Sequence, residues 1–331
     1  MISSTDKPSP DAGCRSWGVD MVRVVGIIAI IVGHVWADSA TVRQWIYPWS
    51  VPLFFFLSGY LDRTSGATLL RSIRCLSLLL PYVSWLIVIG AAWVASGCGS
   101  RCSTAGIAEV LLGGAHATRP FSTFWFVTAL VVVRLSVVVL SRAGAWVPWL
   151  VGAIGWALTA LWPSTVAAVP FAAGVAVPAM VFFAAGRVVQ RARAVRPLMV
   201  VLVAGGALAP AVVMMASGVA PFDLKYGQLG TPFLSAVCAL LVCVGAVCVA
   251  QLLDQVRASR VCSAVSALAV CGVGVVLTHP AVLWVLDVPT SGSWTGFAAA
   301  CVVPWVVMLA LLRTRAAPLL LGRPPLVRRS W

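Results

Sequence analysis

The sequence predicts an all-α membrane protein, a polytopic bundle of about ten transmembrane helices. Of its 331 residues, 61% are hydrophobic and only 10% are charged, whereas a soluble domain carries about 25% charged residues. The mean hydropathy is +1.01. The apolar residues come in runs of roughly 17 to 25, the length that crosses a hydrocarbon core as a helix. A water-soluble globular domain is therefore excluded.

Ten apolar runs are separated by short clusters of Arg, Gly, Pro and Ser, and we expect each run to form one spanning helix. A cytoplasmic tail (1–21), a transmembrane domain (22–312) and a basic cytoplasmic tail (313–331) follow from them. Reading the first run as a signal peptide, cleaved near Val35-Trp36-Ala37, would discard the most specific motif of the chain. The predicted spans are 22–40, 46–61, 74–96, 123–141, 145–162, 168–189, 197–218, 232–253, 262–286 and 293–312.

The basic residues set the expected orientation. If both tails lie on one side of the membrane, that side carries 18 Lys and Arg residues, and the other side carries four, Arg43, Arg101, Arg119 and Lys225. Because cytoplasmic loops are enriched in Lys and Arg, we expect both termini in the cytoplasm and the long 97–122 connection outside. The net charge of +14 is then mostly a topology signal, and it does not predict a nucleic-acid partner.

The ten cysteines do not predict a metal site. The sequence has no Cys-x-x-Cys or His–Cys ligand set. Inside predicted spans a free thiol behaves as a small apolar residue, and this applies to Cys238, Cys243, Cys248, Cys262, Cys271 and Cys301. Cys98 and Cys102 differ, because both fall on the predicted outer side and are close enough to pair in an oxidising compartment. We expect no metal ion and keep Cys98–Cys102 as a candidate disulfide.

The first span is unusual because four ionisable residues stand on it or at its ends: Asp20, Arg23, His34 and Asp38. At about 100° per residue, Arg23 and His34 are only about 20° apart around a helix, and about 16 Å apart along it. Asp20 and Asp38 fall within about 60° on the same stripe. Such groups usually face a bundle interior or a wet cavity. The stripe predicts a functional site, although a snorkelling arginine and a packed histidine would give the same pattern.

Several short motifs follow one another in a fixed order. Asp20-x-x-Arg23 and the spacing from Arg23 to His34 come first, followed by Pro-Leu-Phe-Phe-x-Leu-Ser-Gly-Tyr over 52–60 and Arg71-x-x-Arg74 before a proline. Phe124-Trp125-Phe126 and Thr278-His279-Pro280 come later. This ordered set resembles the membrane-bound acyltransferase-3 family, whose bacterial members O-acylate sugars, surface glycans and some small molecules. The resemblance covers nearly the whole chain.

The resemblance implies an O-acyltransferase of the bacterial plasma membrane. Its donor substrate would be cytoplasmic acyl-CoA, with acetyl-CoA expected, and its acceptor a hydroxyl of a sugar, a lipid-linked glycan or a small molecule. His34 matches the family's essential histidine, and a neutral imidazole can take a hydroxyl proton. Asp38, one turn further on, could fix the tautomer of that imidazole. Arg23 matches the family's paired arginine, which can position a phosphate or polarise a thioester carbonyl.

The remaining candidates divide between the two sides of the membrane. Arg71 and Arg74, three residues apart at the predicted cytoplasmic surface, can bind the phosphates of coenzyme A together or simply anchor the loop. Trp125, Lys225, Tyr226 and His279 fall in the predicted outer half, on the acceptor side. Trp125 fits interfacial anchoring as well as substrate stacking, and His279 fits an interfacial residue beside a proline kink.

Two further residues carry less information. Arg134, within a span, would line a donor path or reach a neighbouring carbonyl. His116 is expected to be a solvated loop residue.

A transporter or flippase without acyl chemistry is the rival reading. It would share the helix number and the polar stripe. However, the sequence lacks paired broken helices at corresponding positions of two halves, the usual sign of a transporter site. We therefore expect an enzyme whose partners are acyl-CoA, an acceptor and the lipid bilayer.

Overall fold

The computed structural model describes residues 16–62, 77–97, 103–192, 196–256 and 259–322, and over these ranges the chain is an all-α helix bundle without strands. The long helices are α1 (Trp17–Val35), α2 (Ala40–Tyr60), α4 (Leu79–Ala95), α6 (Phe124–Leu140), α7 (Val147–Leu161), α9 (Ala173–Arg191), α10 (Pro197–Ala216), α11 (Leu234–Leu253), α12 (Ser259–Val270), α13 (Gly272–Val285) and α14 (Trp294–Leu311). Short segments between them are α5 (Thr104–Leu112), η3 (Gly114–His116), α8 (Pro163–Ala167), η4 (Pro170–Ala172), η5 (Leu224–Tyr226) and α15 (Ala317–Leu321).

The predicted membrane character is confirmed. Within the described ranges, five helices are long and apolar enough to cross a membrane, namely α1, α10, α11, α14 and the segment Pro170–Arg191 that contains α9. The bent pair α12 and α13 adds a sixth if it forms one span, and α4, α6 and α7 are shorter apolar helices. The chain is thus a polytopic membrane protein.

The predicted span over 262–286 is not one continuous helix. α12 and α13 meet at Cys271 with a bend of 62°. Gly272 and Gly274 follow the break, and glycine weakens a helix because it loses more backbone conformational entropy on folding than other residues. A Cβ atom at Gly272 would lie 2.8 Å from Cδ1 of Ile27, so the glycine also lets α13 approach α1.

Two other boundaries differ from the prediction. α1 begins at Trp17 and ends at Val35, so Asp20 lies inside the helix and Asp38 lies beyond its end. The 97–122 connection, expected to be a loop, contains α5 and η3 within its described part.

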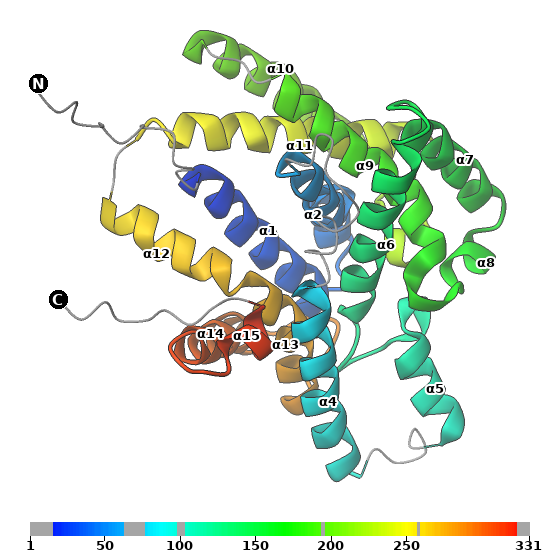
Figure 1. The fold of residues 1–331 in the computed structure, drawn as a ribbon, viewed down its shortest axis with the longest axis vertical. Coiled ribbons are helices and arrows are strands. Elements are labelled where there is room, and N and C mark those ends of the chain that lie inside the picture. The colour runs from blue at the N-terminus through cyan, green and yellow to red at the C-terminus, as the bar shows by residue number, and fades with distance from the viewer. Residues whose placement is uncertain (1–15, 63–76, 98–102, 193–195, 257–258, 323–331) are drawn as a thin grey trace, which may run out of the picture.

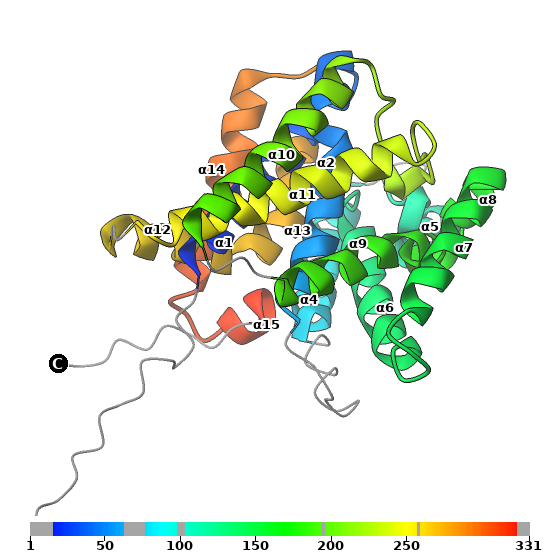
Figure 2. The ribbon, with the colours of Figure 1, turned by 90° about the horizontal axis from the view of Figure 1, so that it is seen from above.

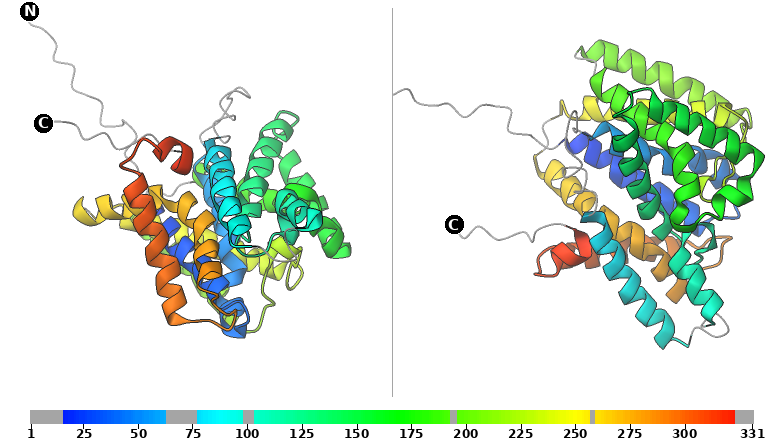
Figure 3. Two further views of the ribbon diagram at one scale, coloured as in Figure 1. Left: turned by 90° about the horizontal axis from the view of Figure 1, so that it is seen from below. Right: turned by 45° about the vertical axis from the view of Figure 1, so that its right-hand side comes forward.

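α1 lies in the middle of the bundle, with α11 and α12 on either side of it in Figure 1. It packs against α2, α11, α12, α13 and α14. Its residues contribute to both large apolar clusters, Val19 and Val22 to one and Ile27 and Ile31 to the other. α10 packs along α11 at the periphery (Figure 2), and α13 lies beside α14 (Figure 3). Most side chains of the central helix therefore point into protein, and Val25 is an exposed exception.

Small residues allow α2 and α9 to cross closely. A Cβ atom at Gly59 would lie 1.9 Å from the carbonyl oxygen of Phe183, and one at Gly186 would lie 2.0 Å from that of Phe56. Membrane helices associate through such contacts, because lipid offers no hydrophobic drive between helices. Phe55, Phe56 and Phe183 lie at this crossing and are fully buried.

Gly186→Ala is expected to destabilise the folded protein by about 2–4 kcal/mol, because the added methyl group must displace backbone rather than a flexible side chain. Thermal unfolding in detergent, followed by size-exclusion chromatography, would measure this. Gly205→Ala on the exposed face of α10, where nothing lies within 4 Å of the added Cβ, is the matched control and should unfold like the wild type. Equal midpoints for the two variants would contradict the close crossing.

Candidate active site

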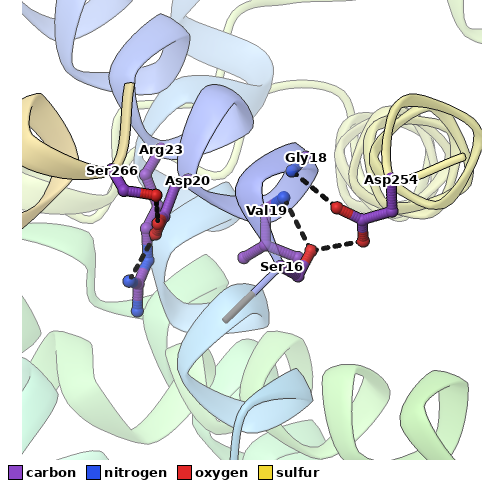
Figure 4. Close-up of polar contacts among 7 residues, drawn as sticks. All are labelled: Ser16, Gly18, Val19, Asp20, Arg23, Asp254 and Ser266. Carbon is purple, nitrogen blue, oxygen red and sulfur yellow. Dashed lines mark hydrogen bonds and ion pairs between the residues drawn. The ribbon is translucent and has the colours of Figure 1, made fainter. Parts of the chain in front are cut away.

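The N-terminus of α1 is fixed by an acidic side chain from the end of α11 (Figure 4). Asp254 accepts a hydrogen bond from Oγ of Ser16 at 2.6 Å and one from the backbone N–H of Gly18 at 2.9 Å. Oγ of Ser16 in turn accepts from the N–H of Val19 at 3.1 Å. These bonds satisfy N–H groups that a helix start leaves open, and a carboxylate there is favoured by the helix dipole.

One turn further on, a buried carboxylate holds Arg23 in place (Figure 4). Asp20 accepts a hydrogen bond from Oγ of Ser266 on α12 at 2.8 Å, and Nη1 of Arg23 lies 3.5 Å from its other oxygen. Asp20 is 2% exposed at its side chain and Arg23 is 31% exposed. The guanidinium is thus oriented by Asp20 while part of it faces open space.

That space is a cavity of about 570 Å³ between α1, α2, α6 and α13. Arg23, Ser58, Ser77 and Arg134 supply polar groups to its wall, and Ile27, Phe126 and Val276 are among its apolar lining. The polar groups lie toward the side of the bundle where α1 begins and α2 ends, which we call the termini side. Such a cavity is large enough to hold a small molecule or part of a cofactor.

Arg134 both lines the cavity and forms an ion pair. Its Nη2 lies 3.8 Å from Oδ1 of Asp62, and Nε of Arg187 lies 3.8 Å from Oδ2 of the same buried carboxylate. Nη1 of Arg187 also lies 3.3 Å from Oγ of Ser141, to which it donates. These contacts join the ends of α2, α6 and α9 on the termini side. A buried charge needs such pairing, so Arg134 has a structural partner as well as a place in the cavity wall.

Two histidines meet at the far end of α1, which we call the His34 side. The imidazole rings of His34 and His279 stack edge to face, with centroids 5.2 Å apart and an interplanar angle of 61°. Ile27 stands seven residues before His34 on α1, and Gly272 stands seven residues before His279 on α13. Because Ile27 contacts Gly272, the two helices run parallel in register here. The histidine pair is therefore about 10 Å further along both helices than the Ile27–Gly272 contact.

His279 has a defined tautomer. It is fully buried, and its Nδ1 lies 3.0 Å from the carbonyl oxygen of Val275. A carbonyl only accepts, so Nδ1 carries the proton and the neutral ring leaves Nε2 as an acceptor. Nε2 is buried and has no hydrogen-bond partner among the described residues. Because buried polar atoms are nearly always paired, this unpaired nitrogen is a candidate acceptor for a ligand.

The C-terminal end of α1 is held by side chains that satisfy its open carbonyls. Arg119 donates through Nη2 to the carbonyl of His34 and through Nη1 to that of Val288. Tyr47 donates through its hydroxyl to the carbonyl of Gly33 at 3.2 Å. Arg119 thus ties the histidine-bearing turn to the connection between α13 and α14.

Asp38 does not form the expected contact with the imidazole. α1 ends at Val35, so the next turn needed to bring Asp38 above His34 is missing. Asp38 is exposed and accepts a hydrogen bond from the hydroxyl of Thr290. Its charge acts on Arg119, the side chain that donates to the carbonyl of His34.

Lys225, from η5, reaches toward the same place. It is 8% exposed, donates through Nζ to the carbonyl of Ala117 at 2.6 Å, and lies 5.2 Å from the ring centroid of Tyr226. Burial lowers the pKa of Lys225 from 10.5 to about 8, although the neighbouring Asp223 raises it. The charges of Lys225 and Arg119 both act on His34. Tyr226 itself is 45% exposed at the surface.

The other predicted residues lie elsewhere. Trp125 is buried in the bundle core beside Phe126, so its ring meets neither the membrane interface nor the His34 side surface. Arg71 and Arg74, and likewise Cys98 and Cys102, lie outside the described residues. Within the described ranges, no group of three or more His, Cys, Asp or Glu residues could hold a metal ion.

The profile of a known family, described as an acyltransferase domain, matches residues 16–313, almost the whole chain. The chain belongs to the acyltransferase-3 family. It is therefore a membrane acyltransferase, and the family that the ordered motifs suggested is confirmed. No curated protein and no solved structure is significantly similar to it.

In this acyltransferase, several residues of the site were missed from the sequence. Arg119, Asp62 and Asp254 bind partners that are distant along the chain, so spacing gave no sign of them. Asp62 could have been identified, because a carboxylate at the end of an apolar span needs a cationic partner. Arg119 stands just before the Phe124-Trp125-Phe126 motif, but from the sequence it serves only as one of the four basic residues that set the orientation.

Stability should depend on pH through Lys225. Its folded pKa of about 8 lies below the unfolded value of 10.5, so between these values the unfolded chain binds more protons and stability rises with pH. Below about pH 8 the full penalty of burying the charge is present. The thermal unfolding midpoints of the wild type and of Lys225→Met would be measured from pH 7 to 10.5. The wild-type midpoint should rise relative to that of Lys225→Met as the pH increases. A difference that does not change with pH would contradict the lowered pKa of Lys225.

Proposed function

We propose that this membrane acyltransferase is an O-acyltransferase of the plasma membrane with both termini in the cytoplasm. It would move an acyl group, expected to be acetyl, from acyl-CoA to a hydroxyl of a sugar, a lipid-linked glycan or a small molecule on the opposite side. One observation carries this proposal. A pair of imidazoles, one with a free acceptor nitrogen, lies just beyond a cavity that has arginines in its wall.

The donor would enter the cavity from the termini side. Arg71 and Arg74 precede Ser77, which lines the cavity, and their guanidinium groups are suited to the phosphates of coenzyme A. Arg23 would then contact the pantetheine arm or a phosphate. It stands eleven residues before His34, or about 16 Å along α1. That separation makes it too distant to polarise the carbonyl that His34 serves, so the second role expected for Arg23 is disfavoured.

The reaction would take place at the histidine pair. The acceptor hydroxyl gives its proton to an imidazole while its oxygen attacks the thioester carbonyl. The C–S bond then breaks, and the CoA thiolate leaves with the proton from the imidazolium. Lys225 and Arg119, whose positive charges act on His34, would favour the negative charge that develops on the carbonyl oxygen. Water is limited there, because His279 is fully buried.

His34→Ala should insert and fold normally but lose about 10²-fold or more of acyl transfer, the amount that general-base catalysis typically supplies. Membranes with wild-type or variant protein would be assayed with labelled acetyl-CoA and cell-surface glycans or lipids as acceptors. His116→Ala is the matched control, because this exposed histidine lies in η3 and should leave the rate unchanged. Near-wild-type transfer by His34→Ala would refute the proposed chemistry.

A further inference from the structure

The cavity ends before it reaches the histidine pair. Its apolar part is formed by Ile27, Phe54, Phe126, Val273 and Val276, while His34 and His279 do not line it. Val276 stands three residues before His279, which is about 4.5 Å along α13. The cavity therefore stops within about one helical turn of the proposed reaction centre.

Phe126 and Phe54 form the aromatic part of this end. The ring of Phe126 packs edge to face on Phe54 and Phe55, with centroids 5.9 and 5.2 Å away. The side chain is nevertheless only half-buried, and it lines the cavity. Because its other neighbours are packed, the exposed part of the ring faces the cavity.

The end of the cavity is also held rigidly. Thr123, one turn before Phe126, donates through its hydroxyl to the carbonyl of Val276 at 2.7 Å. This bond fixes the start of α6 against α13. Gly272 brings α13 against Ile27 of α1. The walls come from three helices that are joined by short contacts, so the space cannot expand without repacking them.

The arginines and the end of the cavity nearest the histidines occupy different levels, although Leu61, Leu78 and Leu321 also line the cavity on the termini side. Along α6, Arg134 stands eight residues beyond Phe126, about 12 Å away along the axis. Along α1, Arg23 stands four residues before Ile27. A donor whose polar part contacts the arginines would therefore place its acyl end beside Phe126. We infer that Phe126 is a specificity-determining residue, which restricts the donor to short acyl chains by closing the apolar end of the cavity.

This inference rests on the proposed use of acyl-CoA. Apolar pockets discriminate chain length through fit, with about 10-fold or more for a methylene that cannot be accommodated. The full-length protein in detergent would be loaded with labelled acetyl-CoA. Unlabelled CoA, acetyl-CoA, butyryl-CoA and octanoyl-CoA would then compete for it. Octanoyl-CoA should compete at least 10-fold more weakly than acetyl-CoA with the wild type.

Two substitutions enlarge the end of the cavity and one fills it. Phe126→Leu, and Phe126→Ala where it folds, should shift the preference toward octanoyl-CoA by about 10-fold. Val273→Phe should weaken butyryl-CoA relative to acetyl-CoA. Phe182→Leu is the matched control, because Phe182 is buried against Trp156 and Phe222 and does not line the cavity.

The outcomes separate the two proposals. Unchanged chain-length ratios in both Phe126 variants, or the same shift in Phe182→Leu, would overturn the role of Phe126 while leaving acyl-CoA as donor. A wild type that binds all chain lengths equally would also overturn it. A wild type that binds no labelled acetyl-CoA would instead refute the donor, and the inference with it. CoA itself should compete equally well with every variant, because the discrimination lies in the acyl part.

Discussion

The structure depends on the cost of placing ionisable and polar groups inside an apolar helix bundle. α1 carries such groups from one end to the other, and each must find a partner within protein. Asp20 receives Ser266 and Arg23, the start of the helix receives Asp254, and its end receives Arg119 and Tyr47. Apart from Arg23, which is on α1 itself, these partners come from four other parts of the chain. The position of α1 at the centre of the bundle follows from this requirement, because no lipid-facing helix could satisfy it.

The same requirement separates the site into two levels. Arginine and carboxylate groups gather on the termini side, where Asp62 pairs with both Arg134 and Arg187. The histidines lie about 16 Å from Arg23 along α1, at the level of Lys225 and Arg119. A cavity occupies the first level and stops short of the second. This arrangement suits a reaction in which a charged donor stays on one side while its acyl group meets an acceptor from the other.

The sequence predicted the bundle well because long apolar runs report directly on membrane spans. It also placed Arg23 and His34 on one face of one helix, since helical periodicity is a local property. The break at Cys271 was missed, because glycines are common in membrane helices and the contacts that require this pair, Gly272 with Ile27 and Gly274 with Met308, are distant along the chain. Arg119 was missed for a different reason. Its partners, the carbonyls of His34 and Val288, are backbone atoms far away in the chain that no motif records.

The central claim is that His34 and His279 act as one unit, and a double-mutant cycle tests it most directly. His34→Gln, His279→Gln and the double variant would be compared by kcat/KM for acyl transfer in membranes, with insertion levels measured in parallel. Residues that serve the same proton transfer are strongly non-additive. We predict that each single variant loses about 10²-fold and that the double variant loses no more than the worse single one. Losses that multiply, or a wild-type rate in His279→Gln, would contradict the account.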